Sequence, residues 1–322
     1  MSLYPLKFHT IYKEKLWGGQ KIKTVLKKDF GTLANCGEAW GLSGIRGNVS
    51  IINNGKFAGI NLTDLIADKK GGLVGSSIYE RFGDEFPLLI KFIDAERDLS
   101  IQVHPDDRRA RERHNGSGKA EMWYILQADY KATLINGFKK DTDKAAFINH
   151  LKNGTLVDIL NREEADEGDA FYLPAGRVHT VGGGLLLAEI QQASDLTYRI
   201  YDFDRTDKDG NKRELHTDLA IDAIDYSKPA HVKSYYEQIP NQVNNIVASP
   251  FFITNKIDAN QKMPIDTSEL DSFKIYISVK GAGRIAGEAI KFGEVMLVPA
   301  SIKKYDIEPD NKLELLESYI QL

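Results

Sequence analysis

Two segments of this 322-residue chain repeat one pattern, and the repeat limits the folds that the chain can adopt. Residues 168–181 read GDAFYLPAGRVHTV, and residues 293–306 read GEVMLVPASIKKYD. Each begins with glycine and an acid, continues with four mostly apolar residues, and then reaches Pro-Ala. A glycine-acid turn that leads into a strand ending at proline is typical of a β-hairpin. Two copies therefore predict two related β-barrels.

Most of the remaining chain reads as short strands separated by Gly, Pro, Asn and Asp, which favours a sandwich or barrel. We predict strands at 86–93, 122–127, 170–173, 185–191, 273–279 and 294–298. Helix-like spacing of apolar residues predicts helical stretches at 63–82, with a Gly-Gly break, and at 142–160, interrupted by Asn153-Gly154. The prediction is a mainly β protein with a small helical portion.

The two copies of the repeat differ at one informative position. His179 in the first copy corresponds to Lys304 in the second. A lysine at that place predicts a second barrel that cannot bind a metal there. The segment 225–230 is the predicted boundary between the barrels, because Pro229 interrupts regular structure.

The composition argues against nucleic-acid and membrane partners. The formal net charge is −4, so no basic excess favours nucleic acid. No stretch approaches the roughly 18 apolar residues that span a bilayer, and the first residues do not resemble a secretory signal. Cys36 is the only cysteine, which excludes an intramolecular disulfide and suits a reducing cytosol. We predict a cytoplasmic protein.

Two other features of the chain do not indicate binding sites. The basic run from Arg108 to Arg113 is interspersed with acids and is interpreted as a solvated turn. The glycines 182–184 are not followed by Gly-Lys-Ser/Thr, so they do not form a phosphate-binding loop.

A set of four side chains predicts a metal site. Gln102 and His104 are two residues apart in a strand-like run, so they share one face of the strand. Glu121 begins another predicted strand, and His179 follows a Pro-Ala-Gly turn. An amide oxygen, two imidazoles and a carboxylate suit one zinc ion and leave room for substrate or water. The alternative is a strand histidine that satisfies a hydrogen bond in the core.

Lys119 and Arg199 are candidates for chemistry beside such a metal. Lys119 lies two residues before Glu121, and a nearby divalent cation favours the neutral amine, which suits proton transfer. The alternative is a solvated loop lysine after a Gly-Ser-Gly segment. Arg199 lies in an aromatic-rich run and suits a developing enediolate or a phosphate. Its alternative is a structural salt bridge with Asp202 or Asp204.

Several motifs together resemble one family. They read LWGG (16–19), CGEAWGLSG (36–44), FPLLIKFIDAERDLSIQVHPDD (86–107), KAEMWYIL (119–126), LPAGRVHTVGGG (173–184) and EIQQASDLTYRIYDFDR (189–205). In content and order they resemble the type I mannose-6-phosphate isomerases, in their short bacterial form. The resemblance extends over most of the chain and is looser after Pro229. It implies the cupin fold, here a bicupin of two jelly-roll β-barrels.

The resemblance also implies the division of the chain and the roles of residues. Residues 1–225 would form the catalytic cupin domain with helical insertions, whose N-terminal strands are free to pair with the second barrel. Residues 226–322 would form a degenerate cupin domain without metal. Zinc would be held by Gln102, His104, Glu121 and His179, and Arg199 would be the active-site arginine. Lys91 and Ser100 match positions at the phosphate end of the pocket, and Lys119, Glu189 and Asp195 match other pocket residues. The chain departs from longer relatives at Gly118, where they tend to carry histidine, and at Ala120, where they carry proline.

We therefore predict a zinc-dependent isomerase that interconverts D-mannose 6-phosphate and D-fructose 6-phosphate through an enediol. Lys119 or Glu189 would move the proton. A non-catalytic sugar-phosphate-binding cupin is the alternative of a different class, and an iron-dependent cupin oxygenase is the alternative among enzymes. A degenerate member would be expected to lose Lys119 or Arg199 first, and both are present. The sequence leaves the oligomeric state open.

Overall fold

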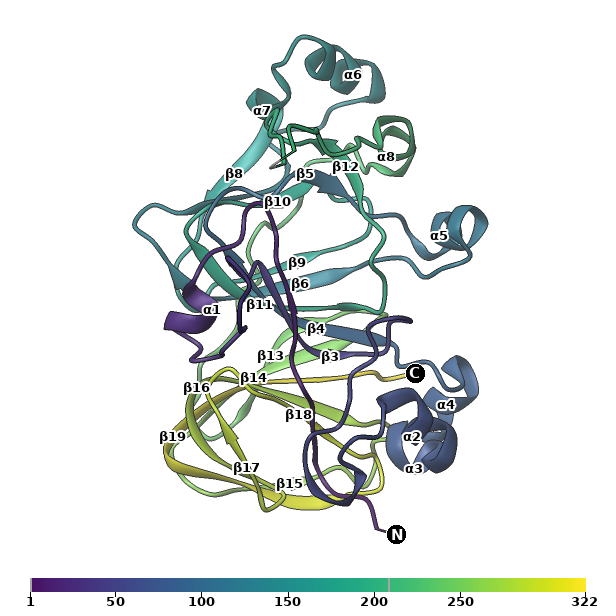
Figure 1. The fold of residues 1–322 in the computed structure, drawn as a ribbon, viewed down its shortest axis with the longest axis vertical. Helices are drawn as coiled ribbons and strands as arrows, with labels where there is room; N and C mark the ends of the chain where they lie inside the picture. The colour runs from purple at the N-terminus through teal and green to yellow at the C-terminus, as the bar shows by residue number, and fades with distance from the viewer. Residues whose placement is uncertain (1, 208) are drawn as a thin grey trace.

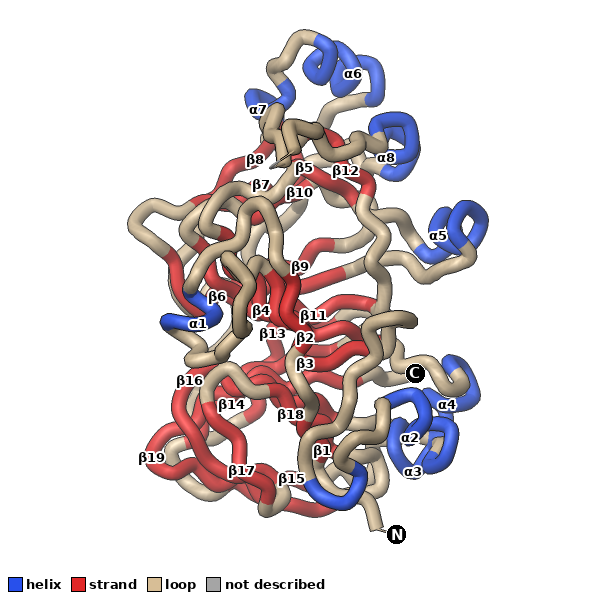
Figure 2. Tube along the Cα trace, viewed as in Figure 1, coloured by secondary structure: helices blue, strands red, loops and turns tan. Residues whose placement is uncertain are grey.

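The structure is a computed structural model that describes residues 2–207 and 209–322. These residues form antiparallel sheets stacked along the long axis of the molecule, with helices at the periphery (Figures 1 and 2). We call them the upper, central and lower sheets, as they appear in Figure 1.

Hydrogen bonding links the strands of each sheet in an order that differs from their order along the chain. From one edge to the other, the upper sheet contains β12 (Tyr198–Tyr201), β5 (Ile101–Val103), β10 (His179–Val181), β7 (Thr133–Phe138) and β8 (Leu160–Glu164). The central sheet contains β2 (Ile11–Lys13), β3 (Glu38–Ser43), β4 (Leu88–Ala95), β11 (Leu185–Gln192), β6 (Glu121–Ala128) and β9 (Ala170–Leu173). The lower sheet contains β1 (Leu6–Lys7), β18 (Val295–Val298), β16 (Lys274–Ile285), β19 (Lys304–Tyr319), β14 (Ile253–Ala259) and β13 (Val243–Ala248), with β15 (Met263–Asp266) on β19 and β17 (Glu288–Lys291) on β16.

The central sheet is covered on both faces, which explains why its middle strands are almost continuously apolar. Ile90 of β4 and Ile190 of β11 point toward the lower sheet and share a core with Leu297. Residues of opposite parity point toward the upper sheet, where Leu187 packs in a second core with Val181. Because side chains alternate along a strand, Lys91 and Glu189 also face the upper sheet.

Helices cover the outer surfaces. The outer face of the upper sheet packs against α6 (Lys144–Lys152), α7 (Leu156–Ile159) and α8 (Thr217–Ala223). The helices α2 (Leu62–Lys69), α3 (Gly71–Val74) and α4 (Ser76–Phe82) pack beside the lower and central sheets, as does the 3₁₀ turn η1 (Gly55–Phe57). The remaining helices are α1 (Lys21–Thr24) and α5 (Asp107–His114). The helices of the described residues are all too short or too polar to traverse a lipid bilayer.

The predicted elements are confirmed at most positions. Every predicted strand corresponds to an observed one within a few residues, except that the strand beginning at 273 continues to Ile285 as β16. The segment 63–82 forms α2 to α4, and 142–160 divides into α6 and α7 around Asn153-Gly154. The mainly β class is therefore confirmed. The sheets of the described residues are open along their hydrogen-bonding paths, so the two jelly-roll barrels stay a prediction.

The interpretation of the basic run as a turn is wrong. These residues form helix α5. Asp106 caps its N-terminus, because the Asp106 carboxylate accepts a hydrogen bond from the backbone N–H of Arg109 at 2.7 Å. An i,i+4 ion pair between Arg108 and Glu112, at 3.2 Å, adds local support. The capping residue and the i,i+4 charge pair were therefore both present in the sequence as signals of a helix.

The two copies of the repeat have the same local structure. Gly168 and Gly293 adopt positive φ angles of 91° and 79°, as their turns require. The strands that follow are β9 and β18, which pair with β6 and β16. After Pro-Ala, His179 begins β10 and Lys304 begins β19. The residue correspondence read from the sequence therefore also holds in space.

Candidate active site

Two rows of side chains face each other between the central and upper sheets. In the central sheet, Trp40, Lys91, Glu189 and Trp123 are register partners across β3, β4, β11 and β6. In the upper sheet, Arg199, Gln102 and His179 are register partners across β12, β5 and β10. Strand pairing thus gathers residues that are far apart in the sequence into one site.

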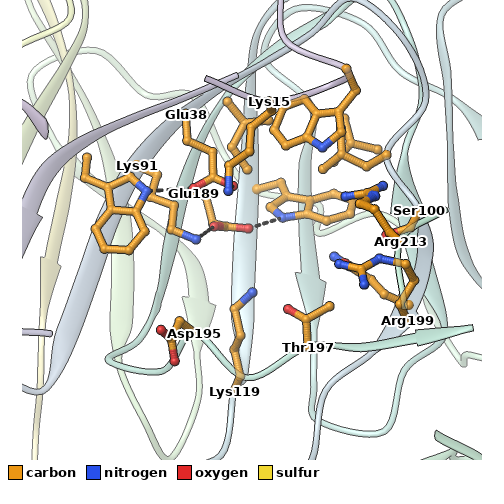
Figure 3. A pocket seen from close by; sticks show the side chains of 17 residues that line it. Lys15, Glu38, Lys91, Ser100, Lys119, Glu189, Asp195, Thr197, Arg199 and Arg213 are labelled. Atoms are coloured by element: carbon orange, nitrogen blue, oxygen red, sulfur yellow. Dashed lines mark hydrogen bonds and ion pairs between the residues drawn. The ribbon is translucent and has the colours of Figure 1, made fainter. Parts of the chain in front are cut away.

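A cavity of about 300 Å³ lies between these rows (Figure 3). All of the predicted catalytic and substrate-contacting residues line it: Lys91, Ser100, Lys119, Glu189, Asp195 and Arg199. Its polar lining also includes Gln102, Lys15, Glu38, Thr197 and Arg213, and its aromatic lining is Trp17, Trp40 and Trp123. Five lining side chains are cationic and three are acidic. The cavity therefore favours an anionic ligand although the chain carries a net charge of −4.

His104, Glu121 and His179 form a buried cluster whose ligand atoms all lie within 4.8 Å of one another. Nε2 of His104 is 3.4 Å from Oε2 of Glu121, and Nε2 of His179 is 3.3 Å from Oε1. Ligand atoms at zinc distances of about 2.0–2.1 Å in tetrahedral geometry are separated by about 3.3–3.4 Å. The amide of Gln102 lies 3.3 Å from Nε2 of His179 and completes the set. The predicted quartet therefore converges and could hold a metal ion.

The hydrogen bonds of the two imidazoles direct their Nε2 lone pairs into the cluster. Nδ1 of His104 is 2.9 Å from the carbonyl oxygen of Leu196, and Nδ1 of His179 is 2.8 Å from that of Arg177. A carbonyl only accepts, so each Nδ1–H donates and each Nε2 is unprotonated. Burial, and then the Lys119 ammonium, lower the pKa of His104 to about 3. Burial also lowers the pKa of His179.

Glu121 supplies the negative charge of the cluster. Its two carboxylate oxygens are buried and face the two imidazoles and the Lys119 ammonium. Burial alone would raise the pKa of Glu121, but Lys119 and the two imidazoles hold it well below its usual value. Neutral imidazoles, an ionised carboxylate and an amide are the donor set of a borderline divalent metal.

Lys119 connects this cluster to the cavity. Its Nζ is 2.9 Å from Oε2 of Glu121 and 3.0 Å from Nε2 of His104, and the side chain is buried while lining the cavity. The alternative of a solvated loop lysine is therefore wrong. The amine lies beside the atoms that would bind a metal.

Lys91 and Glu189 form a buried ion pair at 3.1 Å. Trp123 Nε1 donates a hydrogen bond to Oε1 of Glu189 at 3.0 Å. Burial raises the pKa of Glu189, and the charge of Glu121 adds to this. Burial alone would lower the pKa of Lys91, but the surrounding carboxylates of Glu189, Glu38 and Glu121 raise it. Lys91 is therefore a firmly charged lysine whose charge is compensated within the protein.

Arg199 is free of the salt bridges that were its structural alternative. Asp202 pairs with Arg205 and Arg213, and Asp204 pairs with Lys212 at 2.7 Å. The Arg199 guanidinium donates to the carbonyl oxygen of Glu214 at 2.7 Å. Its buried Nε has no partner among the described residues. Arg199 therefore presents charge to the cavity.

Known proteins with similar sequences identify the family. The model of "Phosphomannose isomerase type I, catalytic domain" matches residues 5–139. The mannose-6-phosphate isomerase ManA of Bacillus subtilis is 34% identical over 318 residues, which are 96% of this chain and 97% of that protein. This chain belongs to the type I phosphomannose isomerase family.

Further relatives of this phosphomannose isomerase family agree over the full length. The mannose-6-phosphate isomerase of Streptococcus mutans is 33% identical over 98% of both chains. The crystal structure of the Bacillus subtilis mannose 6-phosphate isomerase superposes with a TM-score of 0.86 at 30% identity, covering 98% of this chain and 99% of that one. The resemblance read from the motifs is therefore confirmed, and the chain is an aldose–ketose isomerase of this family.

Some cavity residues of this family member were not assigned from the sequence: Lys15, Trp17, Glu38, Trp40, Thr197 and Arg213. Glu38 accepts a hydrogen bond from Trp40 Nε1 at 2.7 Å and pairs with Lys15 at 3.1 Å. Burial opposes its ionisation, but Lys91 and Lys15 lower the pKa of Glu38 to about 2. Trp17, Glu38, Trp40 and Thr197 lie within motifs quoted for the resemblance, which was the available signal.

Proposed function

We propose that this protein is a zinc-dependent isomerase that interconverts D-mannose 6-phosphate and D-fructose 6-phosphate through an enediol. The observation that carries the proposal is the donor cluster of His104, Glu121 and His179, which opens through Lys119 onto a cationic cavity. One zinc ion per chain would be held by these residues and Gln102, where it would orient sugar oxygens and act as a Lewis acid. The family membership supports the reaction.

The protein's own residues supply the proton transfer and the charge stabilisation. In the reaction a base takes the proton from C2 of the open sugar and returns it to C1. We assign this step to Lys119 or Glu189, which both line the cavity; the raised pKa of Glu189 suits acid–base work near neutral pH. Arg199 would stabilise negative charge on the oxygens of the enediol. Lys91, Ser100 and Asp195 would contact the sugar phosphate and position its carbons.

The alternative of a non-catalytic sugar-phosphate-binding protein is less well supported. A binding protein has no need of a buried amine against metal ligands, yet Lys119 is held there by two contacts. A binding protein also has no need of an arginine such as Arg199, which lines the cavity and pairs with no carboxylate. Both features suit catalysis.

We also propose that residues 1–225 form the catalytic barrel and 226–322 a degenerate barrel without metal. The strand register supports this. Leu173 in the first copy of the repeat pairs with Glu121, and the corresponding residue of the second copy, Val298, pairs with Lys274. His179 in the first copy pairs with Gln102, and the corresponding Lys304 of the second copy pairs with Asp266. Two lysines thus occupy the places of two metal ligands. The N-terminal strand β1 pairs with β18, so the first residues belong to the lower sheet.

The test is a coupled assay of purified protein with mannose 6-phosphate, combined with metal analysis. We expect about one zinc per chain, loss of activity after chelation, and recovery when zinc is restored. Activity that is indifferent to both treatments would contradict the zinc role. Phosphate-dependent sugar binding without turnover, in protein with its full metal content, would favour the binding protein instead.

A further inference from the structure

We infer that Gln191 is a positioning residue for the reaction, because its side-chain amide fixes the turn that orients His104 and brings Asp195 into the cavity. This turn comprises residues 192–197, between β11 and β12, and we call it the β11–β12 turn. The inference rests on the proposed function, since it treats His104 as a metal ligand and Asp195 as a substrate contact. Gln191 is not among the described residues that line the cavity, so it acts through its neighbours.

Gln191 is fully buried near the end of β11, next to the metal cluster. It is the register partner of Glu121 on β6 and of Leu89 on β4. Because side chains alternate along a strand, Gln191 points to the same side of the central sheet as Glu189, toward the upper sheet. Its amide therefore lies in the layer between the two sheets that also contains the metal cluster.

The hydrogen bonds of the Gln191 amide go to the β11–β12 turn. Its Nε2 donates to the carbonyl oxygen of Ser194 at 2.6 Å and to that of Gln192 at 2.9 Å. A carbonyl only accepts, so the amide nitrogen must face the turn. Oε1 is buried and has no partner among the described residues, which costs free energy. An apolar side chain would avoid that cost, so the two donated bonds are what an apolar residue could not supply.

The turn connects this amide to three parts of the site. The carbonyl oxygen of Leu196 accepts from Nδ1 of His104 at 2.9 Å, which directs the other ring nitrogen into the metal cluster. Asp195 and Thr197 line the cavity, as Figure 3 shows. The turn then leads into β12, which contains Arg199. A displacement of the turn would therefore move a metal ligand and cavity residues together.

The start of the turn is held independently of Gln191, whereas its middle is not. The backbone N–H of Ala193 donates to the carbonyl oxygen of Pro87 at 2.9 Å and fixes the start. Further along, the Leu196 N–H is 3.4 Å from Ser194 Oγ, which is near the limit of a hydrogen bond. Among the described residues, the Gln191 amide is thus the polar restraint that links the fixed start of the turn to the Leu196 carbonyl.

The test measures zinc affinity by competition with a chromogenic chelator in the parent protein and in Gln191→Met. Methionine has a similar length and no donor, so it removes both bonds with little change in packing. We expect zinc to bind about tenfold or more weakly, as when an outer group that orients a metal ligand is removed. At saturating zinc, kcat/KM for mannose 6-phosphate should still be about tenfold lower, because Asp195 is displaced.

The matched control is Asn244→Leu, which removes a buried amide that fixes a turn in the lower sheet. Asn244 Nδ2 donates to the carbonyl oxygens of Ile239 and Gln242 at 3.0 and 3.2 Å. The melting temperature should fall in both variants, but in Asn244→Leu zinc affinity and kcat/KM should stay within about threefold of the parent. Zinc affinity within about threefold of the parent in folded Gln191→Met would overturn the inference.

A second readout does not depend on metal. The buried Nδ1 proton of His104 should give a slowly exchanging imidazole signal in NMR spectra, since it is donated to a carbonyl. We expect Gln191→Met to lose or broaden this signal, while the Nδ1 proton of His179, which is donated to the carbonyl of Arg177, keeps its signal. An unchanged His104 signal would also overturn the inference.

The two readouts separate this inference from the proposed function. If the His104 signal changes as expected but the parent protein binds no zinc, the zinc-dependent reaction fails and the positioning role of Gln191 stands. If Gln191→Met does not fold, Gln191→Asn replaces it, because the shorter amide remains polar but cannot reach both carbonyls. Gln191→Asn should weaken zinc binding by at least about threefold, and parent-like zinc affinity in it would contradict the inference.

Discussion

Lys91 and Glu189 are direct cross-strand partners in the central sheet, and their charged groups meet 3.1 Å apart inside the molecule. The side chains are only 8% and 4% exposed. A buried ion pair rarely adds much stability over an apolar pair of similar size, but removing one partner leaves the other charge buried without compensation. A buried ion pair in the two middle strands of the sheet therefore indicates a functional constraint.

Two substitutions of Glu189 should separate its chemical role from its structural one. Glu189→Gln keeps an acceptor for Trp123 Nε1 and nearly the same shape but removes the ion-pair partner of Lys91, on which Glu38 and Glu121 still act, so we expect a loss of about 2–3 kcal/mol in unfolding free energy. Its kcat should fall by about a hundredfold or more if Glu189 moves the proton. Glu189→Leu removes the acceptor as well and should destabilise the fold by about 3–5 kcal/mol. Unchanged kcat in Glu189→Gln would assign the proton transfer to Lys119.

Acid should lower the free energy of unfolding of the chelator-treated protein, because His104 and His179 are buried as neutral imidazoles. The pKa of His104 falls from 6.5 to about 3, and the pKa of His179 is also lowered, chiefly by burial. Below about pH 6.5 the unfolded chain binds protons at these residues and the folded protein does not. The free energy of unfolding should therefore fall as the pH drops below about 6.5, by roughly 1.4 kcal/mol per pH unit for His104 down to about pH 3, with a further loss from His179.

Carboxyl groups whose pKa is raised in the folded protein, Asp94 and Glu189, oppose this trend, so variants must be compared with the parent protein. Burial raises the pKa of Asp94 to about 6, so its protonation favours the folded state as the pH falls from about 6 toward 3.8. Denaturant unfolding across this range should show a shallower loss of stability in His104→Gln than in the parent. His231→Gln, an exposed histidine outside the cluster, should keep the parent slope. Equal slopes in all three proteins would contradict the assignment.

The metal ligands could be predicted because local rules place them. Gln102 and His104 share a strand face by parity alone, and the Pro-Ala turn before His179 marks the start of a strand. The row Trp40, Lys91, Glu189 and Trp123 could not be predicted in the same way. It depends on the strand order β3, β4, β11 and β6, in which β11 lies between β4 and β6 although it follows both in the sequence.

Arg213 illustrates a second limit. It follows β12 in a segment without regular secondary structure, and no periodicity links it to the cavity. Its position depends on the side chain of Asp202, eleven residues earlier, which turns it back toward Arg199. Helix α5 shows the opposite failure, because its cap residue Asp106 was present in the sequence but the high charge of the segment suggested a turn. Long-range pairing explains the first miss, and neglected capping explains the second.

Arg199→Ala should lower kcat without unfolding the protein. The guanidinium contacts the carbonyl oxygen of Glu214 but no carboxylate, so its loss leaves no buried charge unpaired. We expect kcat to fall by about a hundredfold to a thousandfold, as when a donor to a developing oxyanion is removed. Arg162→Ala, at an exposed arginine of the same sheet, is the control for general effects. A kcat within about threefold of the parent, in folded Arg199→Ala, would refute the role.

Gly118 explains a departure from the longer relatives and yields a prediction about Lys119. A Cβ at this position would lie 2.5 Å from the backbone nitrogen of Asp107, at the start of α5. The Gly118 N–H also donates to the Asp107 carboxylate at 2.8 Å. The close approach of α5 thus leaves no room for a side chain at this position, including a histidine. It also fixes the backbone next to Lys119, whose N–H donates to the carbonyl oxygen of Pro105 at 3.1 Å.

Gly118→Ala should therefore damage catalysis through the position of Lys119. The backbone must shift by several tenths of an ångström to relieve the contact, and Lys119 Nζ would leave its 2.9 Å contact with Glu121. We expect a loss of about 1–3 kcal/mol in unfolding free energy and a decrease of about tenfold or more in kcat. Gly116→Ala is a matched control, because a Cβ there would make its nearest contact with Leu196 at an ordinary 3.7 Å. Equal kinetics in the two variants would show that the packing of α5 does not position the lysine.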